Sequence, residues 1–172
     1  ALTADFTPRD WVVSGSLPGN RPGRALFGID FAGGTCAPGG DESGVLHIVS
    51  PQITIPASVA DPRLTFDHWV STEAGFDGGN LKISVNDGPW QLVKAADFIY
   101  NPYNSTLATA AQGNTNPMAG EPAFTGSDGG SVEGSWGRSI VNLAPYAKSK
   151  DKIRLRFDMG GQDVQHVQRK LQ

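Results

Sequence analysis

The feature that most constrains the fold is an alternation of apolar and polar residues with a period of two. It is clearest in residues 81–86 and 152–157; in the first of these, Leu81, Ile83 and Val85 fall on one side. Successive side chains of a β-strand point to opposite faces, so the pattern predicts two strands that are each buried on one face only.

Shorter apolar runs bounded by Gly, Pro, Asn or Asp predict seven more strands: residues 11–13, 25–31, 45–49, 52–55, 63–70, 90–93 and 139–143. The Asp-Gly pair within residues 86–89 predicts a tight hairpin turn, because such turns need positive φ angles. Helical periodicity is confined to residues 105–112 and 163–172. About nine strands with so little helix predict an all-β fold, a jelly-roll-like antiparallel β-sandwich formed by residues 1–172 as a single domain.

Composition agrees with this fold class and excludes some partners. The 22 Gly and 12 Pro residues suit many strands joined by tight turns. The formal charge is −3 and no basic run is present, so we expect no nucleic-acid partner. No stretch approaches the roughly 20 apolar residues that a membrane-spanning helix needs, so we expect no membrane span.

A long loop insertion is predicted at residues 100–136, where the alternation is lost and Asn, Gly, Pro, Ser and Thr dominate. A loop of this length usually binds a ligand or is pinned to the surface. We expect its aromatic residues to pin it, because an unpinned loop of this length would cost much conformational entropy. The alternative is a carbohydrate-binding module in which Tyr103 and Trp136 contact the ligand. By contrast, Trp69 and Trp90 lie within predicted strands and are expected to pack in the core.

Two acidic clusters in Gly-rich loops are candidate metal sites. The candidate ligands are Asp41 and Glu42 in the first cluster, Glu73 and Asp77 in the second, and Asp30, which ends a strand just before the first cluster. Calcium binds six to eight carboxylate, carbonyl or water oxygens on flexible backbone, and these loops offer such ligands. The spacing does not match an EF-hand loop. The alternative is that these residues are solvated turn residues.

No motif for a catalytic centre stands out. The three histidines are scattered, so no zinc-site spacing occurs, and no GxSxG motif presents a nucleophile. His68 is expected to be a structural histidine bonded to the neighbouring Asp67. Cys36, the single cysteine, is either an inert small residue or forms a bridge to a partner outside this chain. A hydrolase using Asp67 or His68 is the least favoured function.

The order of several blocks resembles the MAM-like jelly-roll modules of bacterial secreted proteins; the cleaved-adhesin and immune-inhibitor-type modules are similar. The resemblance lies first in a strand, an acidic Gly loop and the Asp-Gly hairpin, which are residues 64–69 and 73–90. Two further blocks agree: residues 44–53, and residues 136–146 with 153–157. It implies a secreted, non-catalytic accessory or adhesion module, with a protein or glycan surface as its ligand. A neighbouring catalytic domain, such as an extracellular peptidase, is a possible partner.

The resemblance also implies a structural calcium ion held by residues matching Asp41, Glu42, Glu73 and Asp77. One departure concerns the C-terminal tail, residues 159–172. Family members usually end with a Gly-Trp-Tyr-x-Asp-Asp-Val-like strand that completes the sandwich, and this tail has no such strand. The closing strand is then missing, altered or supplied by another chain, and its loss would also remove a partner for Cys36.

Overall fold

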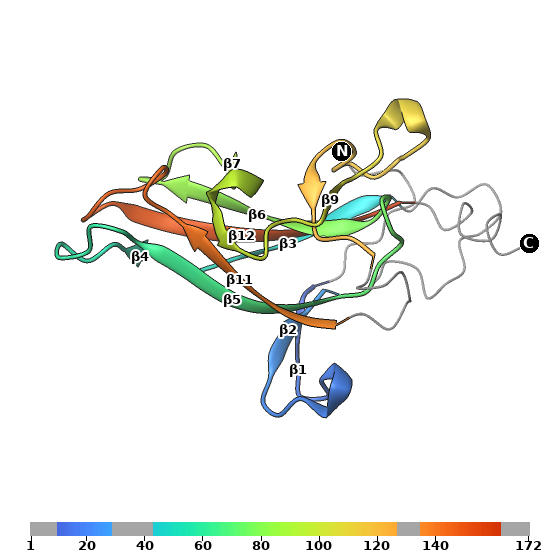
Figure 1. Ribbon diagram of the computed structural model, residues 1–172, viewed down its shortest axis with the longest axis horizontal. Helices are drawn as coiled ribbons and strands as arrows, with labels where there is room; N and C mark the ends of the chain where they lie inside the picture. Colours follow the sequence, from blue (N-terminus) through green and yellow to red (C-terminus); the bar gives the residue numbers. More distant parts are fainter. Residues whose placement is uncertain (1–9, 29–42, 127–134, 163–172) are drawn as a thin grey trace, which may run out of the picture.

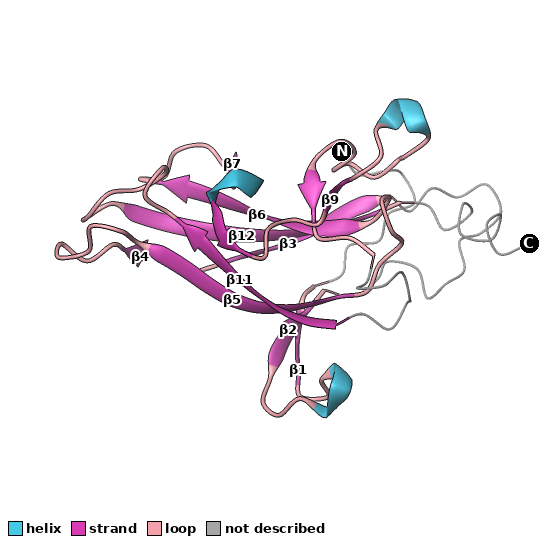
Figure 2. Ribbon diagram, in the orientation of Figure 1, coloured by secondary structure: helices cyan, strands magenta, loops and turns pink. Residues whose placement is uncertain are grey.

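A computed structural model describes residues 10–28, 43–126 and 135–162 of the chain (Figures 1 and 2). These residues contain twelve strands and three single turns of 3-10 helix: β1 (Val12–Ser14), η1 (Pro18–Asn20), β2 (Ala25–Phe27), β3 (Gly44–Val49), β4 (Ile53–Thr54), β5 (Arg63–Val70), β6 (Gly78–Val85), β7 (Gln91–Leu92), η2 (Ala95–Asp97), β8 (Phe98–Tyr100), β9 (Ser105–Thr106), η3 (Ala110–Gln112), β10 (Pro122–Ala123), β11 (Ser135–Asn142) and β12 (Lys152–Gly161). The predicted all-β class is confirmed.

Two antiparallel sheets form the body of the fold. The larger sheet has the order β3-β12-β6-β7, with β4 also paired to β12, and the smaller sheet has the order β5-β11-β8. All of these pairings are antiparallel. The arrangement is consistent with the predicted β-sandwich, whereas the jelly-roll connectivity remains a prediction.

The core lies between the two sheets and follows from the alternation along the strands. Leu81 and Ile83 on β6 face Phe157 and Leu155 on the neighbouring β12, and Val141 comes from β11 of the smaller sheet. Leu81, Ile83 and Val141 have no exposed surface. Burying one such side chain stabilises the folded state by about 1.5–3 kcal/mol relative to leaving it exposed. The face-to-face packing of these side chains therefore holds the two sheets together.

The long connection, residues 101–126, pairs with β6 at Gly79, on the part of that strand's edge that its short pairing with β7 leaves open. Phe124 exchanges backbone hydrogen bonds with Gly79 at 2.8 and 2.9 Å. The Phe124 and Tyr103 rings lie 5.0 Å apart, and Phe124 also contacts Phe66 of β5, with ring centroids 6.3 Å apart. The prediction that aromatic residues pin this segment is confirmed for these two side chains.

The hairpin between β6 and β7 is also confirmed, with one difference. Its positive φ angles fall on Asn86 (51°) and Asp87 (60°), one position before the predicted Asp-Gly pair. The amide of Gly88 donates to the carbonyl of Val85 at 2.9 Å and closes the turn. Asn and Asp tolerate this backbone region better than other non-glycine residues, which explains their place in the turn.

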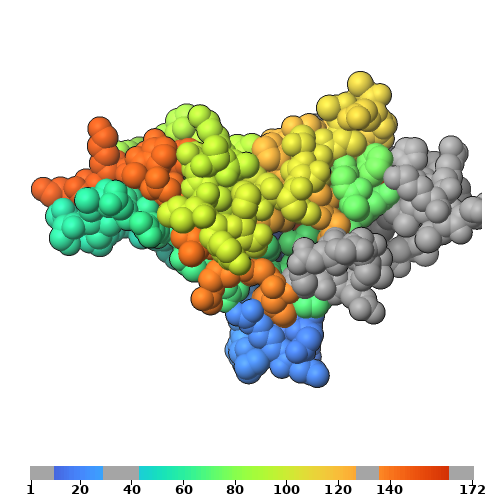
Figure 3. Space-filling view, in the orientation of Figure 1, coloured from blue at the N-terminus to red at the C-terminus, as the bar shows by residue number. Residues whose placement is uncertain are grey.

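A separate hairpin, β1–β2, projects from the body in the space-filling view, where it is blue (Figure 3). Val12 pairs with Phe27 and Val13 with Leu26, and all four side chains are at least 40% exposed. The strand predicted for residues 25–31 ends at Phe27, and residues 29–31 lie outside the described part.

Strand β12 runs to Gly161, beyond the predicted end at residue 157. Residues 163–172 of the C-terminal tail are outside the described residues. Each helix in the described ranges is a turn of three residues, so none of them has the length or apolar character to cross a membrane.

The close contact between Gly78 and the long connection gives a first prediction. A Cβ atom at Gly78 would lie 2.5 Å from the carbonyl oxygen of Phe124. Gly78→Ala should therefore destabilise the fold by about 1–3 kcal/mol through overpacking against backbone, measured by thermal or urea unfolding followed by circular dichroism. Gly15→Ala is the control, because its Cβ would meet no atom within 4 Å. Equal stability of the two variants would contradict the described contact.

Candidate functional site

The acidic loop, residues 71–77, joins β5 to β6 and carries Glu73 and Asp77. The carbonyl of Glu73 accepts hydrogen bonds from the amides of Phe76 (3.2 Å) and Asp77 (3.0 Å), and Gly75 has a φ angle of 79°. The loop is therefore a tight turn that brings its first and last acidic residues back together.

The long connection holds the acidic loop in place. The Phe76 carbonyl accepts hydrogen bonds from the side-chain amides of Asn114 (3.1 Å) and Asn116 (2.9 Å), both of which are buried. The Thr125 hydroxyl accepts from the amide of Gly75 at 2.9 Å. Because buried side-chain amides fix the loop backbone from one side, the positions of the two carboxylates are largely set before any ligand binds.

Gln162, directly after β12, bridges the two acidic residues. Its backbone amide donates to Asp77 Oδ1 at 2.8 Å, and its side-chain Nε2 donates to Glu73 Oε2 at 3.2 Å. The residue is 6% exposed, and its Oε1 has no hydrogen-bond partner among the described residues. An enclosed amide oxygen beside two carboxylates is an oxygen-rich environment that favours a cation.

Two of the five predicted metal ligands, Glu73 and Asp77, are thus brought together. Asp30, Asp41 and Glu42 lie outside the described residues, as does Cys36. Within the described ranges, no group of three or more His, Cys, Asp or Glu side chains is placed to hold a metal ion. Gln162 is not among the ligands that the sequence predicts, because it lies in the atypical C-terminal tail and no acidic or Gly-rich pattern marks it.

Tyr103, the first of the two candidate aromatic ligand contacts, is in the interior. It is 7% exposed, and its hydroxyl accepts from the Leu81 amide at 3.1 Å. Burial raises the pKa of this hydroxyl above its usual range. The prediction that Tyr103 contacts a ligand is therefore wrong, because the ring is used to anchor the long connection.

Trp136, the second candidate, lies on the outer face of the smaller sheet. Its ring packs edge-on against Trp69, with 5.7 Å between the centroids. Its indole N–H donates to the carbonyl of Pro18 at 2.9 Å, and the Arg21 guanidinium lies 4.3 Å from its ring centroid. The expectation that Trp69 packs in the core is wrong, because this residue pairs with Trp136 on the outer side. It is wrong for Trp90 as well, because that ring is only partly buried and lies against Arg156 on the outer face of the larger sheet.

Asp67 shares this outer face and binds two arginines. Its carboxylate accepts from Arg138 Nε at 2.7 Å and also forms an ion pair with Arg21. Hydrogen bonds from Arg138 and Arg21 lower the pKa of Asp67 to about 2. Asp67 is therefore held as an anion by the β1–β2 hairpin on one side and β11 on the other.

His68 points to the opposite side of β5. Its ring lies 4.3 Å from that of Phe124, and its Nε2 is 3.0 Å from the Ser139 hydroxyl. The predicted bond between His68 and Asp67 is wrong, because neighbouring residues of a strand face opposite sides of the sheet. A hydrolase that uses Asp67 and His68 together is not supported by this arrangement.

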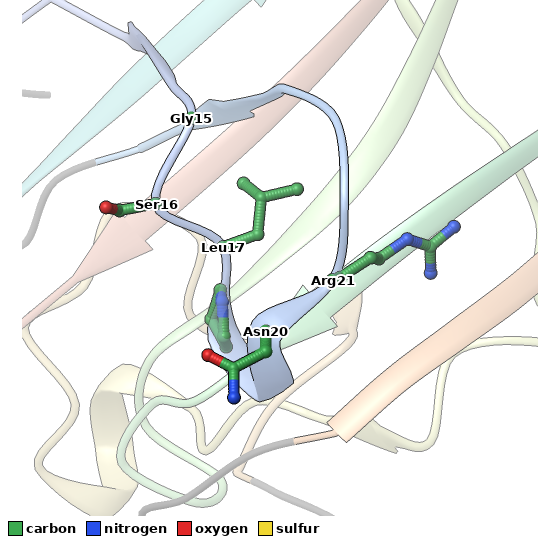
Figure 4. Close-up of a pocket in the computed structure, with 6 residues that line it drawn as sticks. Gly15, Ser16, Leu17, Asn20 and Arg21 are labelled. Atoms are coloured by element: carbon green, nitrogen blue, oxygen red, sulfur yellow. The ribbon is translucent and has the colours of Figure 1, made fainter.

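A hollow of about 560 Å³ lies at the tip of the β1–β2 hairpin. Its lining is contiguous in sequence and consists of Gly15, Ser16, Leu17, Pro18, Asn20 and Arg21. Figure 4 shows the Arg21 side chain directed away from the loop, towards the sheet strands. The hollow therefore has no converging charged groups, and it is a weaker candidate than the acidic loop.

Comparison of the chain with known protein families, curated proteins and solved structures found no match. The resemblance to MAM-like modules remains a prediction from the sequence blocks.

The lowered pKa of Asp67 predicts a specific pH dependence. Its ion pairs stabilise the fold at pH values above about 3.8, the usual pKa of the carboxyl group, and this contribution is lost as the pH falls through about 2. Asp67→Asn should therefore be less stable than the unmodified protein near pH 7, and the gap should close between about pH 4 and pH 2. Urea unfolding across this range measures the gap.

Asp61→Asn serves as the control, since Asp61 is exposed and forms no hydrogen bond within the described ranges. A gap for Asp67→Asn that stays constant with pH would show that the carboxylate is not held by the two arginines.

Proposed function

We propose that this chain is a non-catalytic binding module of a secreted protein, and that Glu73, Asp77 and Gln162 hold a calcium ion. The observation that carries the metal proposal is the enclosed Oε1 of Gln162, which lacks a hydrogen-bond partner in the described part and lies beside two carboxylates. An unsatisfied buried acceptor is rare in folded proteins, and a bound cation is one of its ordinary explanations.

The donor set fits calcium rather than a transition metal. It consists of carboxylate and amide oxygens, which calcium prefers, and neither histidine nor cysteine is among the described residues of the acidic loop. Three side chains do not fill the six to eight positions that calcium uses. We propose Asp30, Asp41 and Glu42 as sources of further oxygens, together with water and loop carbonyls.

A calcium ion at this place would cross-link the two sheets. The acidic loop leaves β5 in the smaller sheet, whereas Gln162 directly follows β12 in the larger sheet. An ion bound to both would tie one end of the sandwich together, and metal binding of this kind adds directly to the free energy of unfolding.

The accessory role rests on the sequence resemblance to modules that stand beside extracellular peptidases and other hydrolases. In this proposal the module engages a protein or glycan surface, and a neighbouring domain performs any catalysis. The outward surfaces of the two sheets are the places where such a ligand would bind.

Calcium should raise the thermal stability. If the dissociation constant is about 10 µM, then about 1 mM calcium stabilises the fold by ~2.7 kcal/mol, or about 5–10 °C in melting temperature. Differential scanning fluorimetry in calcium and in excess chelator measures this shift, and isothermal titration calorimetry measures the affinity.

Matched variants localise the ion. Glu73→Gln and Asp77→Asn should each weaken calcium binding at least about tenfold by removing a charged ligand, whereas Asp61→Asn should leave it unchanged. A melting temperature that chelator does not move, with no heat of calcium binding, would rule out the metal site.

A further inference from the structure

A group of charged and aromatic side chains covers the middle of the outer face of the larger sheet. We call it the charged patch; it consists of Asn80 and Lys82 on β6, Arg156 and Asp158 on β12, Glu121 on the long connection and Trp90 beside β7. In the sheet register, Asn80 lies opposite Asp158 and Lys82 opposite Arg156. The patch is therefore built on adjacent strands at the centre of a sheet.

The four charged residues form one connected network. Lys82 Nζ lies 3.0 Å from Asp158 Oδ2 and 3.0 Å from Glu121 Oε2, and Arg156 Nε lies 2.8 Å from Asp158 Oδ1. Asn80 Nδ2 donates to Glu121 Oε2 at 2.7 Å. Two cations and two anions alternate along this chain, so their formal charges cancel.

The burial of this network is unusual for the outer side of a sheet. The Asp158 side chain is 2% exposed, and the enclosed Asn80 Oδ1 has no hydrogen-bond partner in the described part of the chain. Taking ion pairs out of water costs free energy that their mutual attraction often only offsets. The fold therefore holds these groups in fixed positions without a clear gain in stability.

Glu121 and Arg156 remain accessible, with side chains 33% and 21% exposed. The Arg156 guanidinium lies over the partly exposed Trp90 ring, 5.0 Å from its centroid, and the indole N–H makes no hydrogen bond to another described residue. Exposed His47 on β3 lies opposite Asp158 and borders the patch. The surface thus offers an aromatic ring with a guanidinium over it, and the Glu121 carboxylate bound to Lys82 and Asn80.

We propose that the charged patch binds a neutral oligosaccharide. A sugar hydroxyl both donates and accepts hydrogen bonds, so it is matched by fixed donors and acceptors that alternate over a few ångströms. An indole ring covers the apolar face of a pyranose and can donate one further hydrogen bond. Because the charges cancel, the patch exerts no strong field to select an anionic or cationic ligand.

The other tryptophan surface is less suited to this role. An arginine lies over each ring, Arg21 over Trp136 and Arg156 over Trp90, so this contact does not distinguish the two surfaces. The indole N–H of Trp136, however, is already bonded to the Pro18 carbonyl, whereas that of Trp90 makes no hydrogen bond to another described residue. A saccharide there would first have to displace the β1–β2 hairpin. Trp136→Ala is therefore the matched control for Trp90→Ala.

The inference rests on the proposed role as a binding module, but not on calcium. The test is isothermal titration calorimetry of the full chain with four neutral hexasaccharides, built from β-glucose, xylose, mannose or N-acetylglucosamine, and with oligogalacturonate as an anionic probe. Each titration is run in calcium and in chelator. We expect at least one neutral hexasaccharide to bind, and oligogalacturonate to bind no more tightly.

Trp90→Ala and Glu121→Gln should each weaken that binding at least about tenfold, since each removes a main contact, while Trp136→Ala should leave it unchanged. Glu121→Gln preserves shape and keeps the test valid if Trp90→Ala misfolds. Absence of binding by all four neutral sugars, binding of the anionic probe alone, or loss of binding in Trp136→Ala but not in the patch variants would overturn the proposal. Failure of the calcium site would show only as an unchanged melting temperature in chelator.

Discussion

The rest of the structure depends on strand β12. One face of this strand packs in the core, the other carries residues of the charged patch, and the residue after its end contacts the acidic loop. The strand pairs with β3, β4 and β6 at the centre of the larger sheet. Leu155 and Phe157 point into the core, whereas Arg156 and Asp158 point outwards into the charged patch. Gln162 follows its last residue and reaches the acidic loop. The period of two along one strand thus separates apolar packing from polar chemistry.

The same local rule explains which parts of the fold were predictable. The strands around Leu81 and Leu155 and the hairpin after Val85 depend on alternation and turn residues that lie within a few positions of one another, and all three are confirmed. The outward position of Trp69 could have been predicted as well, since Trp69 is two residues from Asp67 and must share its face. The expectation that a tryptophan within a strand is buried outweighed that signal.

Contacts between distant parts of the chain could not be predicted in this way. The acidic loop was found from its glycines and carboxylates, but Gln162 lies 85 residues after Asp77, and no local pattern connects them. Likewise, Glu121 reaches Asn80 across 41 residues only because the long connection pairs with the edge of β6. The burial of Tyr103 has the same cause: an irregular segment follows no periodicity that would assign its side chains to the inside or the outside.

The acidic loop and the end of β12 are the central feature of the proposed function, because oxygen atoms converge there and the buried Gln162 Oε1 accepts no hydrogen bond from any described residue. A crystal structure of the protein grown in calcium tests this most directly. The account predicts an ion roughly 2.3–2.6 Å from Gln162 Oε1 and from carboxylate oxygens of Glu73 and Asp77. If Gln162 Oε1 instead accepts a hydrogen bond from water or from a protein donor, and no ion touches either carboxylate, the metal site is contradicted.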